Sequence, residues 1–518
     1  MLKPEFTESV SPAFPKMPLA FAQAAPLGTS AGGRLRRLVT LLYCLYGASL
    51  AAPIWLTSHF PTEDGPAHQY WTEVYRSLGD TQSPFQPYYE RSVHWNTPNL
   101  SYFALQLGLS RYLDPATAQR LIITVLLMLW MGATAFLSRT VSGRLTMGSF
   151  AALLLFHGWA LYVGLFSFLL GIPILVTAAG VLLRLLSRWS DPSSSKSGSI
   201  TDQVLLAVLG VLAYYSHLVD GAIFVLLLGI AGAWNYRQPS RGLRLLLPAA
   251  PVCALLLTYL ASNSFGGGGL SWWGHGRTVK SFLGLAFWQG LASDGIGFQA
   301  TRGALALALS LLLIASLRAW LAGTLPASRR LMLVVGGCLA VGYVLVPGAV
   351  GAGGFFKERI QLAMWALVLP TLSANMSRRL QALALTALMA AGAWQLIDFT
   401  GRAHRFGREY SALLQQADGL RPGSLVRFDQ PADKSKFEGS FLSPLLEGGA
   451  IAARCHCIWL GGSHPGTPFY WIRARGDQSS RADFVLRIRD RSEQDADGTR
   501  PTRLSLLVQA TDTSPSSR

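Results

Sequence analysis

The chain is a succession of long apolar runs joined by short polar connections. A hydrocarbon core of about 30 Å requires roughly 20 apolar residues in a helix, and about eleven segments approach that length. They are approximately 36–57, 117–138, 145–162, 165–187, 203–217, 218–234, 243–261, 302–322, 329–348, 357–375 and 379–397. The pattern predicts an all-α polytopic membrane domain over residues 34–397. Two pairs of segments, meeting at Tyr162–Leu165 and at His217–Leu218, form either full crossings or re-entrant hairpins.

Basic residues in the short connections set the orientation of this domain. Lys and Arg accumulate in the cytoplasmic loops of membrane proteins, and a cytoplasmic N-terminus places every short basic cluster on that side. The connections carry Arg139 and Arg144; Arg184, Arg188 and Lys196; Arg237, Arg241 and Arg244; Arg318, Arg329 and Arg330; Arg378 and Arg379. We therefore predict that segments 58–116, 262–301, 349–356 and 398–518 lie on the extracytoplasmic side.

The long outer segments hold most of the polar sequence. Treating Leu100–Leu109 as a further crossing would invert all later loops, so we predict that 99–112 is an interfacial helix, with Tyr102, Phe103 and Tyr112 at headgroup depth. Residues 398–518 show strand-like alternation at Ser424–Phe428, Phe484–Arg489 and Leu504–Val508. They predict a small extracytoplasmic α+β C-terminal domain. Residues 1–33 lack periodicity and read as a disordered cytoplasmic leader.

The charge distribution agrees with a membrane protein and argues against nucleic acid binding. Only 14% of the 518 residues are charged and the net charge is +17. Residues 1–397 contain 27 Lys and Arg against 13 Asp and Glu, whereas 398–518 contain 17 against 14. Because the basic residues form short clusters between apolar runs and no continuous basic stripe, they are topology signals.

Two cysteines of the tail, Cys455 and Cys457, flank a single residue. With His464 nearby they are candidate metal ligands, but adjacent structural ligands usually have the spacing Cys-x2-Cys. A disulfide is the favoured alternative if the tail faces an oxidising compartment.

An acidic pair follows the first apolar run. Glu63 and Asp64 lie in Pro61-Thr-Glu-Asp-Gly-Pro-Ala-His68, where partial desolvation makes a carboxylate a better proton acceptor. The alternative is that the pair caps the following helix. Aromatic residues throughout the same loop suit either a sugar or lipid headgroups.

A second charged cluster, Lys357, Glu358 and Arg359, lies at the outer end of the tenth segment. Ionisable residues at a membrane entry are costly unless paired, and Arg359 with Lys357 is suited to binding a phosphate. The alternative is snorkelling to lipid headgroups.

Two further groups of residues are candidates for substrate binding. His217 and Asp220 share a helix face at spacing i, i+3, where a structural contact between them competes with a functional role. Trp272, Trp273 and His275 follow four glycines in the loop 262–301, which forms either a lid over a site or a linker.

This organisation resembles the GT-C glycosyltransferases, which include protein mannosyltransferases and aminoarabinose transferases. The resemblance rests on the acidic pair after the first helix, and covers roughly 36–400. More narrowly, the 61–68 motif, Tyr162-Val-Gly-Leu-Phe-Ser-Phe-Leu-Leu-Gly171 and Phe356-Lys-Glu-Arg359 are similar to uncharacterised bacterial membrane proteins of that organisation. The resemblance implies a polyprenyl-phosphate-linked sugar donor. It also implies that Glu63 and Asp64 supply the catalytic base or bind a divalent metal such as Mg²⁺ or Mn²⁺.

The sequence therefore predicts an inverting glycosyltransferase of the inner membrane. The donor phosphate lies near Lys357 and Arg359, with His68 among the substrate-binding residues, and Asp64 or Glu63 deprotonates a glycan, lipid or protein acceptor. The alternatives are a transporter or lipid flippase, and a non-catalytic envelope-assembly protein. A transporter would need polar residues near the middle of its spans, and the sequence has few.

Overall fold

The computed structural model describes residues 30–57, 59–190, 196–262, 269–285, 296–350, 354–372, 378–428, 448–460, 472–475, 482–489 and 505–510. Most of the leader 1–33, residues 266–268 of the glycine run, and His464 lie outside the described residues.

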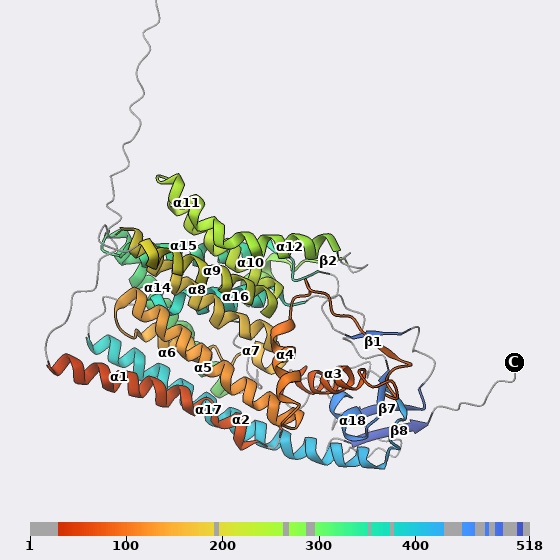
Figure 1. The fold of residues 1–518 in the computed structure, drawn as a ribbon. Helices are drawn as coiled ribbons and strands as arrows, with labels where there is room; N and C mark the ends of the chain where they lie inside the picture. The colour runs from red at the N-terminus through yellow and green to blue at the C-terminus, as the bar shows by residue number, and fades with distance from the viewer. Residues whose placement is uncertain are drawn as a thin grey trace, which may run out of the picture.

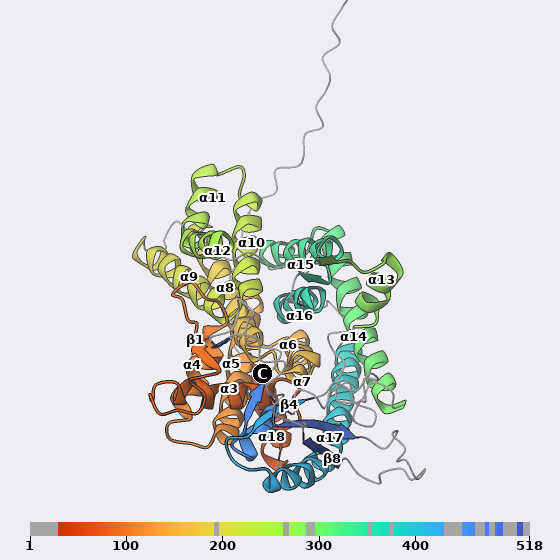
Figure 2. The same ribbon diagram turned by 90° about the vertical axis from the view of Figure 1, so that its right-hand side faces the viewer.

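The described elements are predominantly helical (Figures 1 and 2). The helices are α1 (Ser30–Ser49), α2 (Ala52–Leu56), α3 (Gly65–Ser77), α4 (Leu100–Leu109), α5 (Pro115–Ser142), α6 (Met147–Leu154), α7 (Trp159–Val163), α8 (Phe166–Ser190), α9 (Lys196–Ser216), α10 (Leu218–Trp234), α11 (Pro239–Leu246), α12 (Ala250–Ser262), α13 (His275–Leu283), α14 (Ile296–Leu321), α15 (Ala327–Leu345), α16 (Phe356–Val368), α17 (Arg378–Gln416) and α18 (Gly448–Arg454). The strands are β1 (Tyr89–Arg91), β2 (Leu270–Ser271), β3 (Ala349–Val350), β4 (Leu425–Phe428), β5 (Ile458–Leu460), β6 (Ile472–Ala474), β7 (Phe484–Arg489) and β8 (Ser505–Ala510), and 3₁₀ turns cover Leu247–Ala249, Leu369–Thr371 and Ala417–Gly419.

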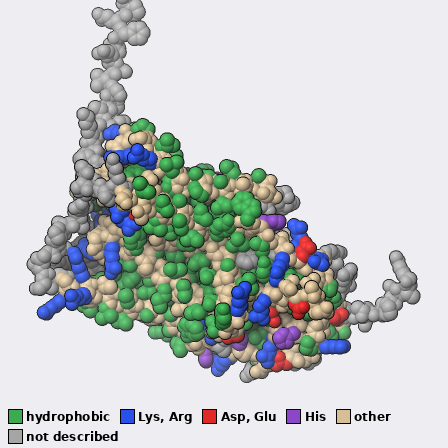
Figure 3. Space-filling view, in the orientation of Figure 1, with side chains coloured by type: hydrophobic (Ala, Val, Ile, Leu, Met, Phe, Trp, Pro, Cys, Tyr) green, Lys and Arg blue, Asp and Glu red, His purple; other side chains and the backbone are tan. Residues whose placement is uncertain are grey.

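Eight helices of the described chain are long and apolar enough to cross a bilayer. They match eight predicted spans: Arg36–Leu56, Pro115–Ser142, Phe166–Ser190, Ser197–Ser216, Pro239–Ser262, Arg302–Leu321, Ala327–Leu345 and Ala382–Gly419. The other three predicted spans correspond to shorter helices: the broken pair α6–α7, α10 and α16. The protein is thus a multi-pass membrane protein, and the space-filling view shows a broad apolar flank between its two ends (Figure 3).

Local sequence explains where α5 begins and ends. The Asp114 side chain accepts a hydrogen bond from the backbone N–H of Thr117 (3.0 Å), and Pro115 occupies the first helical position, which needs no N–H donor. Gly143 ends the helix in the left-handed region (φ 66°). These caps fix the helix on which the outer loop is mounted.

The first outer loop and the C-terminal segment pack into one body at one end of the molecule (Figure 1). The described tail strands form a sheet of order β5-β4-β7-β8, and β6 pairs with β1 of the loop. Trp71 of α3 stacks on Trp459 of β5, with ring centroids 5.5 Å apart. The loop and the tail therefore lie on the same side of the membrane, as the topology requires.

Two details of the prediction change. Tyr102 and Phe103 are 1% and 3% exposed because α4 packs against α3, α5, α8 and α9, so these two rings face protein and not lipid headgroups. The helix α17 also runs without a break through the expected domain boundary at 397/398, so the membrane domain and the tail share one helix.

The tail contains the expected strands at Leu425–Phe428, Phe484–Arg489 and Ser505–Ala510. Cys455 and Cys457 form a disulfide between α18 and β5, which is the alternative favoured over a metal site.

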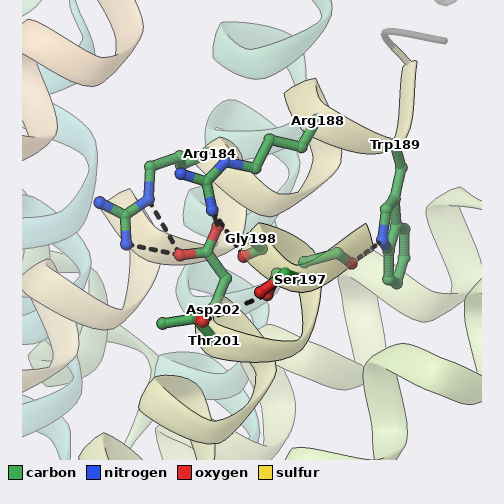
Figure 4. A network of polar contacts seen from close by, with 8 residues as sticks. Arg184, Arg188, Trp189, Ser197, Gly198, Thr201 and Asp202 are labelled. Carbon is green, nitrogen blue, oxygen red and sulfur yellow. Dashed lines mark hydrogen bonds and ion pairs between the residues drawn. The ribbon is translucent and has the colours of Figure 1, made fainter. Parts of the chain in front are cut away.

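An ion-pair network joins α8 to α9 at the end predicted to be cytoplasmic (Figure 4). The Asp202 side chain is 1% exposed and accepts from Arg184 (2.5 Å) and Arg188 (2.7 Å). Because two guanidinium groups satisfy the buried carboxylate, the network holds the α8–α9 pair together where their connection begins.

Candidate functional site

The acidic pair is held by backbone hydrogen bonds to the short helix α7. The N–H groups of Glu63 and Asp64 donate to the carbonyls of Tyr162 (2.7 Å) and Val163 (2.9 Å). Two of the motifs noted in the sequence, 61–68 and 162–171, are therefore in direct contact. These bonds fix the backbone of the acidic pair relative to the membrane domain.

Gly164 makes this contact possible. Its φ of +88° lies in the left-handed region, and a Cβ there would lie 3.0 Å from the Cβ of Asp64 and 3.1 Å from the backbone nitrogens of Asp64 and Gly65. A glycine meets both requirements because it has no Cβ.

The capping alternative for Asp64 is not what the structure has. Asp64 occupies the N-cap position of α3, but its side chain makes no capping hydrogen bond. By contrast, Asp114 does cap α5. The Asp64 side chain is half-buried, and its role is not explained by helix capping.

The first turns of α8 collect polar side chains from other helices. The guanidinium carbon of Arg359, from α16, lies 5.9 Å from the centre of the Phe168 ring, and the His217 ring packs edge-on against the same phenyl group at 5.5 Å. One turn further, Gly171 leaves room for Asp220: a Cβ there would lie 2.0 Å from the Asp220 Oδ2. One face of α8, carrying Phe168 and Gly171, thus gathers residues from α16 and from the start of α10.

The guanidinium group of Arg359 also lies within electrostatic range of three carboxylates, those of Asp220, Glu358 and Asp64. We call Asp64, His217, Asp220 and Arg359 the outer polar cluster. Its members come from distant parts of the chain, and the sequence pattern alone does not bring them together.

Lys357 does not join Arg359. Its side chain is 1% exposed, and Nζ donates to the carbonyls of Tyr343 (2.7 Å) and Val344 (3.3 Å) at the end of α15. Residues two apart on a helix do not share a face, which explains why the two cations diverge. The expectation that Lys357 and Arg359 bind one phosphate is not supported for Lys357, whose ammonium group caps α15.

His217 and Asp220 do not pair with each other. His217 Nδ1 accepts from the Val219 N–H (3.1 Å) and so caps α10, while neither Asp220 oxygen has a hydrogen-bond partner among the described residues. The expected His–Asp contact is therefore absent from the described structure: His217 caps α10, and Asp220 is a separate buried carboxylate. His68, one turn after Asp64, packs its ring near Tyr102 (5.4 Å) and Phe166 (6.0 Å).

Residues of the loop 262–301 pack on the α15–α16 connection. β2 pairs with β3, and Trp273 packs so closely that a Cβ on Gly348 would lie 2.4 Å from its Nε1. Trp272 is 58% exposed and His275 is also exposed. The loop contacts α16 directly, because Gln361 Nε2 donates to the Phe282 carbonyl (2.7 Å), and Arg277 lies within electrostatic range of Glu358.

The donor set does not fit the proposed metal. Glu63 and Asp64 are the expected ligands, but the described residues contain no group of three or more His, Cys, Asp or Glu side chains able to hold an ion. Protein sites for divalent cations use several oxygen ligands, so we derive no step through a metal.

Sequence reasoning missed Gly164, Phe168 and Gly171 as parts of the site. All three lie in the 162–171 motif, and the two glycines inside an apolar stretch were the available signal of close backbone approach.

No protein-family model and no curated protein matches the chain. Its fold is similar to two crystal structures of ArnT from Cupriavidus metallidurans, in the apo state and bound to undecaprenyl phosphate. The structural neighbours are aminoarabinose transferases. The sequence identities are 13% and 12%, the TM-scores are 0.45 and 0.44, and each comparison covers 93% of this chain and 98% of the ArnT chain. At such values no residue of ArnT is carried over, and the function has to be argued from this chain's own side chains.

Proposed function

We propose that the protein is a membrane glycosyltransferase that moves a sugar from a polyprenyl-phosphate-linked donor to an acceptor hydroxyl on the extracytoplasmic face. The donor class comes from the sequence resemblance. The observation that carries the proposal is that Arg359 lies within electrostatic range of Asp64. A base that acts on the acceptor hydroxyl and a cation that acts on the leaving phosphate must both lie near the anomeric carbon of the donor.

Asp64 is the proposed base. Its backbone is fixed by the hydrogen bond to Val163 at 2.9 Å, and its side chain is not used as a helix cap. A carboxylate held in this way is positioned to accept the proton of an acceptor hydroxyl. The backbone of its neighbour Glu63 is fixed by a hydrogen bond to the Tyr162 carbonyl of α7. Glu63 is the second candidate for this role.

In the proposed reaction the acceptor O–H bond breaks and its proton passes to an Asp64 oxygen. The acceptor oxygen forms a bond to the anomeric carbon, and the bond from that carbon to the phosphate oxygen breaks. The electron pair leaves with the polyprenyl phosphate. Arg359 stabilises the charge that develops on the leaving phosphate. A guanidinium group already in position in a partly dehydrated site needs little reorganisation during the reaction.

The test is transfer from labelled polyprenyl-phosphate sugars by the purified full chain. We expect Asp64→Asn and Arg359→Gln each to reduce transfer by about 10²-fold or more. Asp80→Asn is the matched control, because Asp80 is an exposed carboxylate of the same outer loop. Wild-type transfer by Asp64→Asn would remove Asp64 from the mechanism, and would shift the role to Glu63 only if Glu63→Gln were inactive.

A further inference from the structure

Within the described part of the chain, no hydrogen-bond donor reaches the buried carboxylate of Asp220. The residue is 0% exposed, and neither side-chain oxygen has a partner among the described residues. An ionisable group in this position costs free energy unless another charge compensates it. The proposed reaction does not use Asp220, so its presence needs an explanation.

The surroundings fit a carboxylate held in a fixed place. Asp220 lies in the first turn of α10, where the helix dipole favours a negative charge. Gly171 provides the space, since a Cβ at that position would lie 2.0 Å from Oδ2 and 2.4 Å from Cγ of Asp220. His217 does not compensate the charge, because its Nδ1 accepts a hydrogen bond from Val219.

Arg359 and Asp220 approach the same face of α8, Arg359 at Phe168 and Asp220 at Gly171, one helical turn further on. The two charges lie within electrostatic range of each other. Arg359 Nε has no hydrogen-bond partner among the described residues, and the guanidinium lies against the Phe168 ring. The orientation of Arg359 is therefore set by a ring and by charge, not by a direct hydrogen bond at Nε.

We propose that Asp220 is the buried counter-ion that holds Arg359 against Phe168 and so positions its guanidinium group for the donor phosphate. The positioning of Arg359 for the donor phosphate rests on the proposed function, whereas the counter-ion role of Asp220 does not. Because Asp220 is fully dehydrated, its attraction for Arg359 is little screened. Asp220 is a positioning residue and does not itself touch substrate.

A double-mutant cycle tests the counter-ion role without any assay of transfer. Thermal unfolding of the purified full chain is compared for wild type, Asp220→Asn, Arg359→Gln and the double variant. We expect each single variant to lower the unfolding temperature, because each leaves one charge buried without its partner, and the double variant to recover part of the loss. Additive losses would overturn the proposal. If Asp220→Asn cannot be purified, a wild-type unfolding temperature for Arg359→Gln overturns it equally.

Binding of undecaprenyl phosphate tests positioning. We expect Asp220→Asn to raise the dissociation constant about tenfold, of the order of a charged hydrogen bond. Asp202→Asn is the matched control: that carboxylate is also buried and held by arginines, but in the network of Arg184 and Arg188. Its loss should lower stability and leave binding unchanged. Equal binding by Asp220→Asn and wild type overturns positioning. Failure of the wild type to bind, with coupling in the cycle intact, overturns the proposed function and leaves the counter-ion role standing.

Discussion

The turn between α7 and α8 offers the sharpest test of how the acidic pair is positioned. Replacing Gly164 by alanine forces an L-residue to adopt φ +88°, which costs about 1–2 kcal/mol. The new Cβ would also lie 3.0 Å from the Cβ of Asp64 and 3.1 Å from two backbone nitrogens. These contacts are with backbone and with the first side-chain carbon, so Asp64 itself must shift by a few tenths of an ångström.

A shift of that size in a catalytic group matters more for rate than for stability. Misplacement by about 1 Å costs about 10²-fold, so we expect Gly164→Ala to lower transfer by roughly tenfold or more. The donor dissociation constant should change less, because Arg359 is held from α16. The assay is transfer rate together with thermal unfolding of each purified variant.

Gly323→Ala separates the two effects. Gly323 also has a positive φ, +70°, but nothing lies within 4 Å of the position its Cβ would take. It should lose the same conformational free energy of about 1–2 kcal/mol and keep the wild-type transfer rate. If Gly164→Ala also kept the wild-type rate, the idea that this turn positions Asp64 would be refuted.

Three further outcomes are expected. Lys357→Met should destabilise the protein by about 1–3 kcal/mol through the lost cap of α15 while undecaprenyl phosphate binding, measured by titration, stays unchanged. Tyr70→Phe removes the hydroxyl that donates to the Cys457 carbonyl (3.2 Å) and accepts from the Trp459 N–H (2.8 Å). Thermal unfolding should show a loss of about 1–3 kcal/mol, absent from Tyr112→Phe at an exposed ring. Burial, together with the charge of Arg120, lowers the pKa of His59 below its usual 6.5. Folding therefore favours the neutral ring. The contribution of His59 to the free energy of unfolding is complete above pH 6.5 and is lost as the pH falls through the lowered pKa. Unfolding curves of His59→Gln should lack this pH dependence.

The membrane spans were predictable because their signal is local. Twenty apolar residues in a row predict a crossing whatever they pack against, and eight of the predicted spans are helices of that length. The interfacial aromatic residues were not predictable in the same way. Tyr102 suits either a headgroup layer or a protein interior, and only the packing of α4 decides between the two.

The site was predictable as a set of residues but not as an arrangement. Asp64 and Arg359 stood out because charged residues at membrane boundaries are rare. Lys357 was grouped with Arg359 because they are close in sequence, but the direction of a helical side chain depends on position around the helix. Gly164 and Gly171 matter through the atoms that approach them from other helices, and a single sequence does not contain that information.

The tail supports the acidic turn from the side opposite the membrane domain. A Cβ on Gly449 of α18 would lie 2.7 Å from the Cα of Ala67 and 2.9 Å from the carbonyl oxygen of Pro66. The residues that follow Asp64 thus pack against α18, while the hydrogen bond to α7 fixes Asp64 itself. Such close packing leaves little room for movement. The C-terminal segment therefore contributes to the position of the proposed base, and a role for it as a detached partner-binding module would leave this contact unexplained.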